Sequence, residues 1–120
     1  MANGYKQQLV DAGVDVDGAL DRFMENKALY KKFLLKFVED KSFEKLMDCL
    51  DAGDASGAFM QAHALKGVAG NLGFEHLLEV LSPLTEQLRS GDMAGIPVKQ
   101  EEVRKRYGRI CAIINANKGE

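Results

Sequence analysis

Apolar residues recur at intervals of three and four along almost the whole chain, and this spacing constrains the fold more than any other feature. Residues Phe43, Leu46, Met47 and Leu50 show the pattern clearly. Such spacing places apolar side chains on one face of a helix. Strict alternation of apolar and polar residues, which is typical of strands, is missing, and the chain contains only two prolines. The sequence therefore predicts an all-α fold.

Capping residues and glycines divide this pattern into separate helices. The expected elements are a short helix over Val16–Phe23 capped by Asp15 or Asp17, a helix from near Asn26, a bend or restart at Asp40–Ser42, a helix over Ala55–Leu72 after the cap Asp54, a helix over Phe74–Leu88 kinked by Pro83, a loop over Ser90–Val98, and a final helix carrying Val103, Tyr107, Ile110 and Ile114. A chain of 120 residues favours one domain. We expect an N-terminal extension over 1–12, the bundle over 13–116 and a polar tail over 117–120.

Composition excludes several classes of function. The chain is 46% hydrophobic and 28% charged, which is typical of a folded domain, and its net charge of −2 provides no basic field for nucleic acid. The longest apolar run, Ile110–Ile114, is far too short to span a bilayer, and the first residues lack the apolar stretch of a secretory signal. We expect a cytoplasmic monomer with no membrane or nucleic-acid partner, and buried free thiols at Cys49 and Cys111.

One face of the helix expected over Ala55–Leu72 carries unusual residues. At about 100° per residue, the following side chains fall within roughly 60° of His63: Ser56, Phe59, Met60, Lys66, Gly67 and Gly70. The opposite arc holds Ala58, Ala62, Leu65, Val68, Ala69 and Leu72, which suit a core. His63 is therefore expected to face solvent.

The residue types on this face suit the transfer of a phosphoryl group. An exposed imidazole has a pKa near 6.5, so at neutral pH His63 is mostly an unprotonated nucleophile. Lys66, one turn away, offers a mobile positive charge for the phosphoryl oxygens. Each interior glycine costs a helix about 1 kcal/mol relative to alanine, so Gly67 and Gly70 indicate clearance for another molecule. Ser56, Phe59 and Met60 are expected to contact that partner. We expect no metal site, because His63 and His76 lack further ligands at suitable spacing.

The segment His63-Ala64-Leu65-Lys66-Gly67-Val68-Ala69-Gly70-Asn71-Leu72-Gly73 resembles the signature of histidine-containing phosphotransfer (HPt) domains. Upstream residues also resemble the first two helices of that family: Gly13–Val16, Ala19-Leu20, Arg22-Phe23, Asn26, Leu29-Tyr30 and Phe37. The resemblance covers residues 13 to 115. It implies an antiparallel four-helix bundle with a short additional N-terminal helix. Two residues depart from the expected pattern: Gln61 is polar on the core side of its helix, and Pro83 lies inside a helix. We expect both to affect local packing.

The resemblance also implies a function. His63 would carry phosphate on Nε2 and exchange it with an aspartate of a response-regulator receiver domain, with a hybrid sensor histidine kinase as a further partner. The receiver would hold the Mg²⁺, and this chain would need no cofactor of its own. No glycine-rich phosphate loop is present, so we expect a carrier without kinase activity. The alternative is a helical module that docks a receiver or another signalling protein without being phosphorylated.

Overall fold

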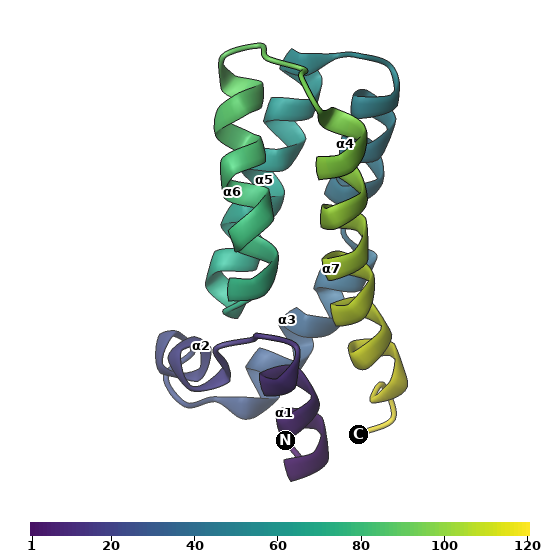
Figure 1. Cartoon of the computed structure of the whole chain (residues 1–120). Helices are drawn as coiled ribbons and strands as arrows, with labels where there is room; N and C mark the ends of the chain where they lie inside the picture. Colours follow the sequence, from purple (N-terminus) through teal and green to yellow (C-terminus); the bar gives the residue numbers. More distant parts are fainter.

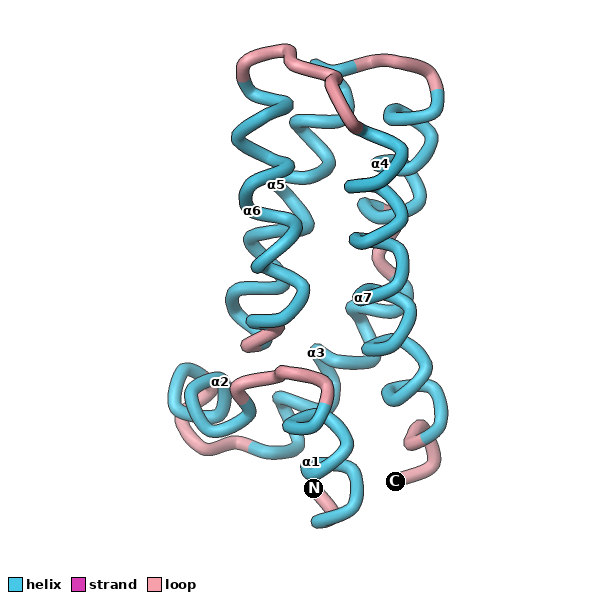
Figure 2. The backbone as a smooth tube through the Cα atoms, in the orientation of Figure 1, coloured by secondary structure: helices cyan, strands magenta, loops and turns pink.

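The computed structural model describes residues 1–120 and contains helices and loops but no strand (Figure 2). Seven helices follow one another along the chain (Figure 1). They are α1 (Asn3–Asp11), α2 (Val16–Arg22), α3 (Lys27–Glu39), α4 (Ser42–Asp51), α5 (Ala55–Leu72), α6 (Glu75–Arg89) and α7 (Ile96–Ala116). The predicted all-α fold class is confirmed.

The body of the molecule is an antiparallel bundle. Helix α5 packs between α4 and α6, and the long helix α7 packs against α6 and runs along α3 and α4 (Figure 1). The break between α3 and α4 falls at Asp40 and Lys41, where the sequence pattern changes phase. Helices α3 and α4 therefore act together as one side of a four-sided bundle. One contiguous cluster of buried apolar side chains fills the interior.

The N-terminal region has two short helices where the sequence analysis expected one. Residues 3–11, which we had assigned to an extension before the bundle, form α1, and its side chains Tyr5 and Leu9 are buried in the core. The spacing of four between these two residues is the sequence signal of this helix. Residues 117–120 also pack against the bundle's N-terminal end, because Asn117 bonds to Gln8 and Glu120 accepts from the Ala2 amide at 2.7 Å.

Helix α5 has the bounds that the sequence predicts, because both of its ends carry strong signals. The Asp54 carboxylate accepts from the Gly57 amide at 2.9 Å. Gly73 takes the left-handed conformation with φ of 81°, which glycine adopts without steric cost. These two ends fix the register of α5 and therefore the face on which His63 lies.

The last two helices differ from expectation in detail. Helix α6 runs from Glu75 to Arg89, one residue later at each end than the sequence predicts, and it contains Pro83 on its exposed side. Helix α7 begins at Ile96, so the loop that we expected to reach Val98 ends earlier. Pro97 lies in the first turn of α7. A backbone N–H has no intrahelical acceptor there, so the lack of an N–H in proline costs no hydrogen bond. Proline marks a helix start there rather than a loop.

Candidate functional site

His63 lies at the middle of α5 and is exposed to solvent. Its neighbours on the outer face are also accessible: the Met60 side chain is 65% exposed, and Ser56 and Gly67 are exposed. On the opposite side the helix buries Ala58, Ala62, Leu65, Ala69 and Leu72. Val68 and Gln61, which the helical wheel also places toward the interior, are only half-buried. The outer face of α5 therefore presents the imidazole directly to an approaching molecule.

An aromatic ring and a guanidinium from a second helix support the imidazole. The rings of Phe59 and His63 are stacked, with centroids 5.8 Å apart and planes inclined by 27°. The Arg89 guanidinium of α6 lies 4.6 Å from the centroid of the Phe59 ring. The sequence analysis placed Phe59 on this face but did not find Arg89. No local motif marks Arg89, since it reaches the site only through the packing of α6 on α5.

Glu86 of α6 adds a negative charge to the same region. Its carboxylate accepts from Arg89 at 3.1 Å, and this hydrogen bond, assisted by the charges of Arg89, Lys66 and His63, lowers the pKa of the Glu86 carboxyl. Lys66 is half-buried beside His63 on α5. The region around the imidazole therefore holds Lys66 on α5 and the paired Arg89 and Glu86 on α6, of which sequence alone predicts only Lys66.

The two site glycines are not required by packing within the chain. A Cβ atom built on Gly67 or Gly70 would meet no heavy atom within 4 Å. Gly57 on the same helix differs, because a Cβ there would clash with the Asp54 carboxylate and lie 3.0 Å from the Cys49 sulfur. Internal structure thus explains Gly57 but leaves Gly67 and Gly70 unexplained. Because these residues have no side chains, nothing projects from the helix surface at these two positions beside His63.

The C-terminal end of α5 is tied firmly to the N-terminal helices. Arg22 of α2 donates to the carbonyl oxygens of Gly70 and Asn71 at 2.9 and 3.2 Å. The buried Tyr30 hydroxyl donates to the carbonyl oxygen of Leu72 at 2.8 Å. These bonds satisfy carbonyls that a helix end otherwise leaves without partners, and the positive charge of Arg22 suits the negative end of the helix dipole. No local sequence signal predicts this anchor, because Arg22 and Tyr30 are more than 40 positions from the carbonyls that they contact.

An apolar surface on α3 adjoins the site helix. Phe33 is 39% exposed and lines a hollow together with Val68 and Leu72 of α5. Leu29, one turn earlier, is 37% exposed, and the Lys36 ammonium lies 5.1 Å from the centroid of the Phe33 ring. Phe37, four residues further along the same side of α3, is fully buried. Helical spacing groups the two rings on one side of α3 but does not say where the core ends.

No cluster of three or more histidine, cysteine, aspartate or glutamate side chains has a geometry able to hold a metal ion. His76 lies half-buried at the start of α6, away from His63, and its carbonyl oxygen accepts from Arg106 at 2.8 Å. Cys49 and Cys111 are half-buried free thiols.

Comparison with protein-family models gives a match to the Hpt domain over residues 33–113, more than half of the chain. This chain belongs to the Hpt family. The matched range contains all of α4, α5 and α6 and therefore the whole face around His63, whereas α1 and α2 precede it. Hpt domains are phosphocarrier modules of two-component signalling and interact with receiver domains and histidine kinases. Searches of curated proteins and of solved structures gave no match. None of the seven helices combines the length and apolar character needed to cross a membrane.

Proposed function

We propose that His63 of this Hpt domain reversibly accepts a phosphoryl group from a receiver-domain aspartate and donates it onward. The observation that carries the proposal is the exposed imidazole at the centre of α5, with Lys66 one turn away and two glycines whose missing side chains face open space. Nothing in the chain's own packing requires this combination. It suits a site that another protein must approach closely.

In the transfer step, the lone pair on Nε2 of neutral His63 attacks the phosphorus of an aspartyl phosphate. The N–P bond forms as the P–O bond to the aspartate breaks, and the aspartate leaves as a carboxylate. Lys66 and Arg89 supply positive charge for the phosphoryl oxygens. Arg89 of α6 lies against the Phe59 ring, which in turn stacks on the His63 imidazole. The receiver is expected to provide the Mg²⁺. The reverse transfer uses the same groups. Because the sequence has no glycine-rich phosphate loop, the chain acts in this proposal as a carrier without kinase activity of its own.

The proposed docking surface for the receiver is the outer face of α5 together with the exposed part of α3. Met60, Gly67 and Gly70 surround His63 directly, and Phe33 and Leu29 extend the apolar area along α3. Ser56 lies at the other end of the face, where it lines a hollow with Phe59 and Arg89. A flat apolar centre with charged groups at its border is typical of protein interfaces.

The deciding experiment is phosphotransfer from several phosphorylated, Mg²⁺-loaded receiver domains, followed by ³¹P NMR of the product. We expect an acid-labile, base-stable phosphate on His63 that is absent from the His63→Gln variant. Circular dichroism should show that the variant is folded, since His63 is exposed. Because a single receiver can fail through mismatch, phosphoramidate serves as a small donor that needs no docking. A folded protein that accepts phosphate from no donor would instead support a docking module that is not phosphorylated.

A further inference from the structure

The antiparallel helices α6 and α7 are connected by side chains at two levels. At one level Arg106 of α7 donates to the Glu79 carboxylate at 3.0 Å and to the His76 carbonyl oxygen at 2.8 Å. At the other level the Lys99 ammonium of α7 donates to the side-chain carbonyl of Gln87 on α6. Glu79 and Gln87 are eight residues apart on α6, so about two helical turns separate the levels.

Between these two levels, no side-chain hydrogen bond joins α6 to α7. Pro83 of α6 lies one turn from both Glu79 and Gln87, and it has no N–H to donate. Glu102 of α7 lies between Lys99 and Arg106 and lines the same hollow as Pro83. The Oε2 atom of Glu102 is the one buried side-chain nitrogen or oxygen in the chain without a hydrogen-bond partner. A buried acceptor of this kind is costly unless a donor reaches it.

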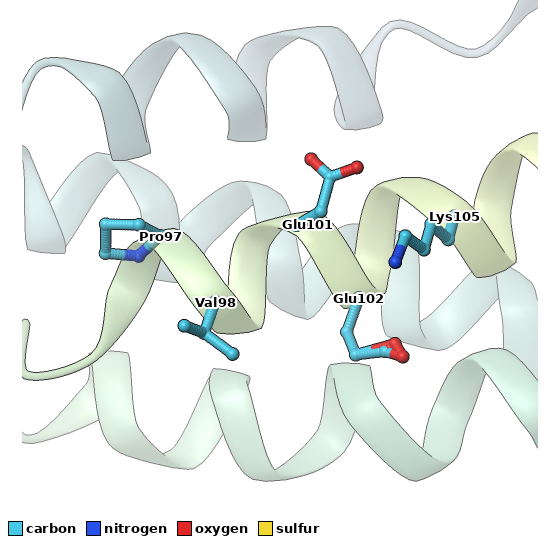
Figure 3. Close-up of a pocket in the computed structure, with 5 residues that line it drawn as sticks. All are labelled: Pro97, Val98, Glu101, Glu102 and Lys105. Atoms are coloured by element: carbon cyan, nitrogen blue, oxygen red, sulfur yellow. The ribbon is translucent and has the colours of Figure 1, made fainter.

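The hollow beside Glu102 is apolar and opens to solvent. Its walls are formed by Glu79, Val80, Pro83 and Leu84 of α6 and by Val98 and Lys99 of α7, and Val98 is 75% exposed. Figure 3, which draws a neighbouring pocket lined by Pro97, Val98, Glu101, Glu102 and Lys105, shows Val98 and Glu102 projecting on the same side of α7 and Glu101 on the other side. The hollow has a volume of about 210 Å³. This lies below the roughly 300–1,000 Å³ of small-molecule pockets and suits one long side chain.

The chain's own cations do not neutralise Glu102. Lys99 and Arg106, each one turn away on α7, are engaged with α6, and Glu101 on the far side of the helix is paired with Arg104 at 2.6 Å. Lys105 forms no ion pair with Glu102. One oxygen of the carboxylate is thus an unpaired acceptor, in a hollow whose two other charged residues, Glu79 and Lys99, are engaged in contacts between α6 and α7. The complementary group is a cationic donor on an apolar stem, and a guanidinium meets a carboxylate with the best geometry.

We propose that this α6–α7 groove, defined by Val80, Pro83, Leu84, Val98 and Glu102, is a second docking site that takes an arginine side chain from an apolar segment of a partner protein. The guanidinium would donate to Glu102, and an apolar neighbour of the arginine would cover Val98. Helix α6 packs against both α5 and α7, and no Cα atom of α5 lies within 8 Å of a Cα atom of α7. A partner in the groove therefore leaves His63 free, and this site is independent of the proposed phosphotransfer.

The test is an amide-shift NMR titration of the full chain with acetyl-Leu-Arg-Leu-amide and with its uncharged analogue acetyl-Leu-Gln-Leu-amide. We expect the arginine peptide to shift amides of residues 79–84 and 98–102 and to bind about tenfold more tightly than the glutamine peptide. The shifts of residues near His63 should not change. If the wild-type chain shows no localised shifts at millimolar peptide, or if the two peptides bind equally, the proposal is overturned.

Two variants assign the effect to the groove. Glu102→Gln keeps the side-chain shape and should remove the preference for arginine, whereas Glu101→Gln changes the same charge on the other side of α7 and should leave the preference intact. Val98→Ser, at a largely exposed position, should weaken both peptides. Equal affinities of wild type and Glu102→Gln for the arginine peptide would contradict the proposal, as would equal losses in the two glutamate variants. Thermal unfolding of each variant checks that the fold is retained.

Discussion

The Arg22 guanidinium lies 2.9 Å from the carbonyl oxygen of Gly70, so a short N-terminal helix holds the end of the helix that presents His63. Gly70 thus has two separate roles. Its missing side chain keeps the outer face of α5 low, while its carbonyl oxygen accepts the anchor from α2. Helix α2, which precedes the matched family range, therefore helps to hold the end of α5.

Replacing Arg22 with methionine should lower the free energy of unfolding by about 1 kcal/mol. The change removes two charge-assisted hydrogen bonds to carbonyl oxygens at a helix end. Because these bonds are exposed to water, each contributes less to the free energy of unfolding than a buried one would. Urea denaturation measures the effect. Lys32→Met is the matched control, because Lys32 is exposed and forms no ion pair. Equal stability of the Arg22 variant and the control would show that the anchor contributes nothing.

The size of the residue at position 67 should separate stability from docking. Gly67→Ala adds a methyl group in open space and restricts the unfolded chain, so the free energy of unfolding should rise by about 1 kcal/mol. Gly67→Leu should fold equally well but reduce phosphotransfer from a receiver at least tenfold, because its side chain projects beside His63. Phosphorylation by phosphoramidate should be nearly unchanged in both variants. Undiminished transfer from the receiver to Gly67→Leu would contradict the clearance role.

The charges contributed by α6 should act in opposite directions on phosphate acceptance. Arg89→Gln removes a cation near the imidazole and should slow acceptance about threefold, as expected for an exposed charge. Glu86→Gln removes a carboxylate that lowers the local positive charge, so acceptance should be at least as fast as in the wild type. Single-turnover transfer at low and at high salt measures both rates. The two effects should shrink at high salt, and a slower Glu86→Gln variant would refute this assignment.

The elements that sequence alone could predict are those with local signals. The ends of α5 follow from Asp54 and Gly73, and the side of α5 on which His63 lies follows from the spacing of its alanines and leucines. The break after Glu39 follows from a shift in the apolar pattern. Each of these features depends on residues within a few positions of one another.

The features that sequence could not predict depend on contacts between distant segments. Arg89 meets Phe59, and Glu86 lies near the charges of Lys66 and His63, only because α6 packs on α5, and Arg22 reaches Gly70 across 48 positions. The exposure of Phe33 follows from where α5 ends beside α3, which periodicity does not reveal. The unpaired carboxylate of Glu102 likewise requires the pairing of α6 with α7. Periodicity therefore predicts faces, and packing decides what those faces meet.

The three tyrosines should make the protein sensitive to alkali. Burial, with the charge of Glu120, raises the pKa of Tyr5 to about 12, and burial first of all raises the pKa values of Tyr30 and Tyr107 as well. The folded state thus holds protons that the unfolded state releases near pH 10, so the stabilisation is complete below pH 10 and is lost as the pH rises toward 12. Absorbance at 295 nm should show tyrosine ionisation only together with the loss of helical circular dichroism. Tyr5→Phe should move that transition to higher pH, and ionisation of all three tyrosines near pH 10 in the folded protein would contradict the burial seen here.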